Sequence, residues 1–141
     1  MSKFVVDASV AAKWFVPEIY SDAATLLLNP AFSLYAPDLI AAELGNVLWK
    51  KVRRGEIESS DAAEILTAFS RMPIEMRPAS VLVGAALELA VAIDRTVYDS
   101  LYLALAIAEN CALITADAKF LAAAKASGAA DHVRWVEDAI T

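Results

Sequence analysis

Residues 3–7, Lys-Phe-Val-Val-Asp, decide the fold, because they have the composition of a short buried strand that ends on an acid. Their β-branched and aromatic side chains favour extended backbone. A helix is expected directly afterwards, over residues 9–15, and Pro17 stops it. A strand joined directly to a helix is the repeating unit of a sheet covered by helices.

The same alternation continues along the chain. No repeat, low-complexity tract or flexible linker divides the 141 residues, and that length fits one domain. We therefore predict an α/β fold with a short, mostly parallel central sheet, as a single domain over residues 1–141. Further strands are expected at 33–36, 74–77, 112–115 and 133–136, and helices at 21–28, 38–54, 60–71, 80–93, 101–108 and 117–126.

Charge and cysteine content exclude some classes of protein. Eighteen acids against twelve Lys and Arg give a net charge of -6, which excludes binding of nucleic acid mainly through overall charge. A local basic rim is compatible with this balance. The single cysteine, Cys111, excludes a disulfide framework within one chain and a Cys-rich zinc site.

The chain is also unusually apolar, with 59% hydrophobic residues. Its longest uncharged run, residues 23–37, has 15 residues and contains two prolines, whereas a membrane span needs about 18 apolar residues. The first residues are too short an apolar stretch for a secretory signal. We therefore expect a cytoplasmic protein, and we expect part of the apolar excess to cover a subunit interface.

Two acids stand just after predicted strands. Asp7 ends the first strand, and Asp117 lies two residues beyond the strand that ends at Thr115. In an open parallel sheet, ligands bind outside the carboxyl ends of the strands. A purely structural role is equally open, because Asp is a favoured residue for capping the helix that follows.

Glu43 is harder to explain by structure alone. In the helix from residue 38, Ile40, Glu43, Val47 and Lys50 share one stripe at helical spacing. A carboxylate beside a buried face is costly unless it has a partner, so an internal ion pair or a site are the alternatives. Asn46 lies one turn further and is a candidate for orienting this carboxylate.

Asp99 is the fourth residue of Thr96-Val-Tyr-Asp, which has the form of a capping box. The box explains an acid there without any function, but the helix behind it is apolar on all sides and therefore central. If the four acids converge, their repulsion requires protons or a counter-ion. An oxygen-only cluster without His or Cys suits Mg²⁺ or Mn²⁺.

Four segments of the chain together resemble the motif regions of PIN-domain proteins, and in particular the VapC toxins of toxin–antitoxin pairs. They occur in the family's order and extend over essentially the whole chain. The segments are residues 5–15 (Val-Val-Asp-Ala-Ser-Val-Ala-Ala-Lys-Trp-Phe), 42–48 (Ala-Glu-Leu-Gly-Asn-Val-Leu), 96–106 (Thr-Val-Tyr-Asp-Ser-Leu-Tyr-Leu-Ala-Leu-Ala) and 113–120 (Leu-Ile-Thr-Ala-Asp-Ala-Lys-Phe).

This resemblance implies an α/β/α sandwich and a Mg²⁺- or Mn²⁺-dependent endoribonuclease. It assigns Asp7, Glu43, Asp99 and Asp117 to the catalytic and metal site, and it gives Ser9 and Thr115 supporting hydroxyl roles. It also implies an RNA substrate, a homodimer and inhibition by a small VapB-type antitoxin. The metal would activate the attacking water and offset charge on the phosphate.

Several basic residues are candidates for binding substrate, and two functions other than a ribonuclease remain open. Lys13, one or two turns beyond Asp7, is the better candidate for binding substrate phosphate. Arg95 and the basic residues at 50–54 are further candidates for such a rim, although those at 50–54 equally stabilise the end of their helix. The first alternative is a catalytically silent PIN-like module that only binds RNA or protein. The second is a phosphoryl-transfer protein of phosphatase or receiver type, since Asp7 also ends a first strand. Ser9 argues against the phosphatase type, because a second Asp is expected there.

Overall fold

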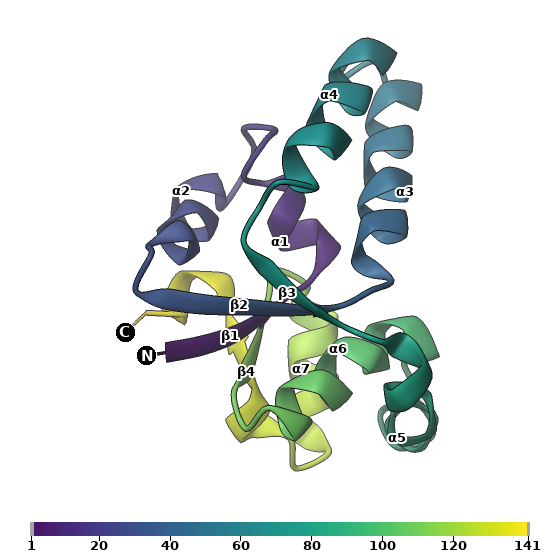
Figure 1. Ribbon diagram of the computed structural model, residues 1–141. Coiled ribbons are helices and arrows are strands. Elements are labelled where there is room, and N and C mark those ends of the chain that lie inside the picture. Colours follow the sequence, from purple (N-terminus) through teal and green to yellow (C-terminus); the bar gives the residue numbers. More distant parts are fainter. Residues whose placement is uncertain (1, 141) are drawn as a thin grey trace.

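The computed structural model describes residues 2–140, and its centre is a parallel sheet of five short strands in the order β3-β2-β1-β4-β5 (Figure 1). Val5 of the middle strand lies opposite Tyr35 on one side and Leu113 on the other. That strand is buried from Phe4 to Val6, which explains why its sequence is continuously apolar. The strands are β1 (Ser2–Val6), β2 (Phe32–Pro37), β3 (Ile74–Arg77), β4 (Ala112–Thr115) and β5 (Val133–Trp135).

Helices cover both faces of this sheet (Figure 1). On one face α1 packs against α3, and α4 returns beside α3 as the second arm of a hairpin; on the other face α6 packs on β1, β2 and β4 with α5 outside it. The predicted α/β/α sandwich is confirmed. The helices are α1 (Ala8–Ala12), α2 (Ser21–Thr25), α3 (Ile40–Arg53), α4 (Ser59–Phe69), α5 (Ala79–Ile93), α6 (Val97–Ala108) and α7 (Ala118–Ala126), with short 3-10 turns at Leu26–Leu28, Ala130–His132 and Val136–Asp138.

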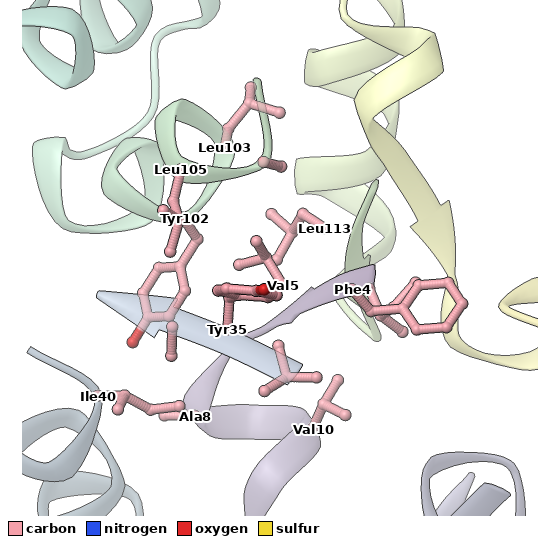
Figure 2. Close-up of a cluster of buried hydrophobic side chains, with 14 of the residues drawn as sticks. Phe4, Val5, Ala8, Val10, Tyr35, Ile40, Tyr102, Leu103, Leu105 and Leu113 are labelled. Atoms are coloured by element: carbon pink, nitrogen blue, oxygen red, sulfur yellow. The ribbon is translucent and has the colours of Figure 1, made fainter. Parts of the chain in front are cut away.

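The core lies between the sheet and α6. Residues 100–106 of α6 are all buried, so its apolar character on every side is a consequence of its central position. Figure 2 shows this cluster, in which Val5 and Leu113 of the sheet lie beside each other and below the α6 residues Leu103 and Leu105. In the same view Tyr102 reaches from α6 toward α3, where Ile40 is labelled, with its hydroxyl pointing to that side.

Several element bounds differ from the expectation. α1 ends at Ala12 rather than near Phe15, because the N–H groups of Lys13, Trp14 and Phe15 bond to carbonyls three residues back and the helix tightens into turns. α6 begins at Val97, four residues before the expected start of the apolar run at 101. α4 is capped by Glu58 rather than by a serine, in a reciprocal box with Asp61. Within residues 2–140 no helix has the length and apolarity that crossing a bilayer requires.

Candidate active site

A pocket of about 250 Å³ opens at the carboxyl edge of the central strands and contains all four predicted acids. Asp7 follows β1 and Asp117 follows β4, and these two strands are parallel neighbours. Their acids therefore meet at one edge of the sheet, while α3 brings Glu43 and α6 brings Asp99. The pocket is lined by Asp7, Ala8, Ser9, Glu43, Asn46, Val47, Lys50, Asp99, Tyr102, Leu113, Thr115, Asp117 and Phe120.

Asp7 caps α1 with one carboxylate oxygen. Its Oδ1 accepts hydrogen bonds from the Val10 backbone N–H at 2.9 Å and from the Ser9 hydroxyl at 2.8 Å. Burial raises the pKa of Asp7 to about 6, against these two hydrogen bonds and with added repulsion from Asp99 and Glu43. Asp7 therefore caps a helix and lines the pocket with the same side chain. Ser9, to which the resemblance gives a supporting role, lies within hydrogen-bond distance of this carboxylate.

Asp117 has the same design at the start of α7. Its Oδ1 accepts from the backbone N–H groups of Lys119 and Phe120, each at 3.0 Å. The Thr115 hydroxyl accepts from the Asp117 backbone N–H at 3.0 Å and so fixes the turn. Burial acts to raise the pKa of Asp117, but the Phe120 N–H bond and the positive charge of Arg95 outweigh it, and the pKa is lowered.

Asp99 lies in the first turn of α6. One hydrogen bond of the expected capping box is present: the Asp99 backbone N–H donates to the Thr96 hydroxyl at 3.1 Å. The carboxylate instead accepts from Arg95, whose Nη2 is 3.0 Å from Asp99 Oδ2. The same Nη2 is 2.7 Å from Asp117 Oδ2. Arg95 therefore holds two of the four acids together, and its guanidinium lies over the Phe120 ring.

Glu43 is half-buried on α3, and its partner is Tyr102 of α6, not Asn46. The Tyr102 hydroxyl donates to Glu43 Oε1 at 2.5 Å. Burial raises the pKa of Glu43, partly against this hydrogen bond and with added repulsion from Asp99. Burial and the nearby carboxylates also raise the pKa of Tyr102, so this hydroxyl stays protonated and remains a donor.

Comparison with known proteins identifies the family. The family model for the PIN domain matches residues 4–126. The chain belongs to the PIN domain family. Among curated proteins it is 38% identical to Ribonuclease VapC3 of Pyrobaculum aerophilum over 118 residues, which cover 82% of this chain and 89% of that protein. The resemblance to PIN-domain VapC proteins is thereby confirmed.

Solved structures agree on the PIN fold. A crystal structure of PAE2754 from Pyrobaculum aerophilum matches with a TM-score of 0.68 at 24% identity, covering 96% of this chain and 85% of that one. VapBC2 from Rickettsia felis, solved bound to a DNA fragment from its promoter, matches with a TM-score of 0.62 at 17% identity, covering 94% and 98%. At these identities the likeness concerns the fold alone.

The carboxylates and hydroxyls that line this PIN-domain pocket suit a divalent metal, although two of the carboxylates pair with Arg95. In residues 2–140 no three His, Cys, Asp or Glu side chains are grouped as a ready-made metal site. Asp99 and Asp117 both pair with Arg95, whose positive charge compensates them. Asp7 and Glu43 have raised pKa values, which shows that their charges are poorly compensated. Carboxylate and hydroxyl oxygens are the ligands that Mg²⁺ and Mn²⁺ prefer.

The cations are distributed differently from the expectation. Lys13, predicted to bind substrate, is outside the pocket lining and buried, with Nζ 3.3 Å from Glu18. Lys50 lines the pocket instead. Tyr102 is not identified as a site residue from the sequence, because it lies in the apolar run of α6. Its position three residues after Asp99, on the same helix face, is the feature that indicates a place near the site.

Proposed function

We propose that this PIN-domain chain is a metal-dependent endoribonuclease and the toxin of a toxin–antitoxin pair. The observation that carries the proposal is that four acids from four separate segments line one pocket. The helix caps account only for the Oδ1 atoms of Asp7 and Asp117. Glu43 costs burial free energy that an apolar residue on α3 would not.

We propose that Asp7 and Asp99 are the main ligands of Mg²⁺ or Mn²⁺, with Asp117 and Glu43 completing the site directly or through water. When bound, the metal would lower the pKa of the attacking water and offset negative charge on the phosphate. Tyr102 holds the Glu43 carboxylate in place by donating to it. Ser9 and Thr115 fix the turns that carry Asp7 and Asp117. Lys50, at the rim, attracts the phosphate of the RNA.

The experiment that tests this function is RNA cleavage by the purified protein. A panel of structured RNAs is incubated with Mn²⁺ and, in parallel, with EDTA. The proposal predicts discrete cleavage products with Mn²⁺ and none with EDTA. The alternative of a silent binding module predicts that RNA is bound but remains whole under both conditions.

Two partners also belong to the proposal. The VapBC2 structure supports a VapB-type antitoxin as the partner that restrains the toxin. A homodimer is supported by the outward face of α5, where Val81, Leu87 and Val91 are 75%, 56% and 78% exposed, an apolar surface of the kind found at interfaces. Light scattering tests the homodimer: it should give a dimer mass for the wild type and a monomer mass for Val91→Asp.

We also propose that residues 1–141 form one domain and act in the cytoplasm, where RNA is available.

A further inference from the structure

One face of α3 leads from the acidic pocket to a second hollow with the opposite charge. Lys50 lies seven residues after Glu43, about two helical turns, and both line the acidic pocket. Lys50 also lines a neighbouring hollow of about 330 Å³ together with Arg53 and Arg54. Because Lys50 belongs to both, the two hollows adjoin, and the rim of the acidic site continues into a basic surface.

The cations of this surface are free to bind an anion. Among the ion pairs of residues 2–140, Lys50 and Arg53 take part in none, and Arg54 reaches only the exposed Glu56, at 3.8 Å. The neighbouring Lys51 is different, since it is buried and pairs with Glu18 at 2.8 Å. In a chain with a net charge of -6, an unpaired basic surface beside the site is a local reversal of sign.

An exposed aromatic ring stands beside these cations. Trp49 is 51% exposed, and the Arg53 guanidinium carbon lies 4.8 Å from its ring centroid. The other two tryptophans are packed: Trp14 donates to the Ala24 carbonyl, and Trp135 lies edge-on to Tyr20. Stabilisation of the α3 carboxyl end explains positive charge at 50–54, but it gives no reason for a large exposed ring beside it.

We propose that Trp49, Lys50 and Arg53, the α3 track, hold the RNA beside the bond to be cleaved. Lys50 and Arg53 bind successive phosphates, and Trp49 stacks an unpaired base together with the Arg53 plane. The inference rests on the proposed ribonuclease function and specifies its substrate as single-stranded or looped RNA. A duplex has no free base face to offer to Trp49.

The test is RNA binding in the Asp7→Asn background, which keeps the RNA whole and preserves the helix cap. The probes are a labelled hairpin with an unpaired loop and a blunt duplex of the same stem. Lys50→Gln/Arg53→Gln should weaken hairpin binding about 20-fold at 0.1 M salt and lower the salt slope by about 1.4, since each phosphate contact on a single strand contributes roughly 0.7. Trp49→Ala should weaken it about 5- to 100-fold, while Trp49→Phe keeps most of the affinity because a ring remains.

The matched control is Arg71→Gln/Lys125→Gln, which makes the same charge change at two exposed positions outside both hollows. This control should bind the hairpin with an affinity within about twofold of that of the Asp7→Asn parent. The parent itself should not bind the duplex tightly. Thermal melts of each variant separate a loss of helix stability from a loss of RNA contacts.

Each other outcome overturns the inference in a distinct way. If the wild type cleaves RNA but the track variants bind like the control, the function stands and the track is wrong. Equal affinity for duplex and hairpin contradicts the stacking role of Trp49. If the variants change only the oligomer mass or antitoxin binding, the surface is a protein interface. If the wild type neither binds nor cleaves any RNA, both the track and the proposed function fail.

Discussion

Arg95 and Asp117 are separated by 22 residues in sequence, yet their side chains meet at the site, with Arg95 Nη2 2.7 Å from Asp117 Oδ2. The same nitrogen lies 3.0 Å from Asp99 Oδ2. One guanidinium therefore compensates two of the four acids of the pocket. If these acids hold a metal, as we propose, metal binding and this ion pair compete for the same carboxylates.

The first prediction concerns that competition. Arg95→Gln should lower the melting temperature in EDTA by about 3 °C, because two partly exposed acids lose a partner worth about 1 kcal/mol. It should also raise Mn²⁺ affinity several-fold, measured by calorimetry, so that Mn²⁺ stabilises the variant more than the wild type. Lys125→Gln is the control for charge. An equal Mn²⁺ affinity in wild type and variant would show that Arg95 does not compete with metal.

The second prediction concerns Asp7 and pH. The pKa of Asp7 is about 6 in the folded state against an ordinary value of 3.8, so the folded protein binds the proton more tightly than the unfolded chain. Above about pH 6 the charge therefore costs stability, by up to about 3 kcal/mol, and below pH 4 the cost vanishes.

Asp7→Asn keeps the cap and removes this charge. In EDTA it should melt above the wild type by roughly 6–12 °C at pH 7, with the difference shrinking as the pH falls from 6 to 4. Melting curves at several pH values measure this. A difference that is constant over that range would mean that Asp7 is not the titrating group.

The third prediction uses two tyrosines on the same helix. Tyr102→Phe removes the donor to Glu43, which should raise the Glu43 pKa further and weaken Mn²⁺ binding about tenfold, a usual effect of losing a group that positions a ligand. Tyr98→Phe is the control, because Tyr98 is 60% exposed and does not line the pocket. Calorimetric titration of Mn²⁺ into both variants distinguishes them. Identical affinities would remove Tyr102 from the site.

The fourth prediction separates a structural ion cluster from the site. Glu18 pairs with the buried Lys13 and Lys51; burial acts to raise its pKa, but the bond from Lys51 and the two charges outweigh it and lower the pKa. Glu18→Gln should destabilise the fold by roughly 2–4 kcal/mol at pH 7, and this loss should disappear as the pH falls below the Glu18 pKa.

Its control is Glu56→Gln, which breaks an exposed pair and should change stability by less than about 1 kcal/mol. Chemical denaturation at pH 7 and at pH 3 measures both variants. The account also expects Lys13→Gln to lower stability without changing RNA affinity. A loss of RNA affinity in a stable Lys13→Gln protein would restore Lys13 as a substrate-binding residue.

The fold followed closely from local sequence because most elements carry a clear pattern. The buried strand at 3–7 and the apolar run at 101–108 are both found, as β1 and within α6. The strand order was not predictable, because it depends on which strands pack against α6 rather than on any one segment. The end of α1 was not predictable to the residue, because residues 13–15 continue the helix in tighter turns that the apolar pattern does not distinguish from an α-helix.

The site was predictable as a set of acids but not as a set of contacts. The four acids stand in recognisable motifs, and all four line one pocket. The partners of those acids come from other elements: Tyr102 reaches Glu43 across 59 residues, and Arg95 reaches Asp117 across 22. Helical spacing identifies residues that share a face, but it carries no information on which neighbouring helix that face meets.

The most direct test of the central claim is RNA cleavage by Asp7→Asn at saturating Mn²⁺, compared with the wild type on the same RNA. Asn preserves the shape and the helix cap but removes a charged oxygen ligand, so the variant should be folded by circular dichroism and should lose cleavage by at least about a hundredfold. Wild-type cleavage by the folded variant would contradict the account, because the pocket of Asp7, Glu43, Asp99 and Asp117 would then not be where the phosphodiester bond is broken.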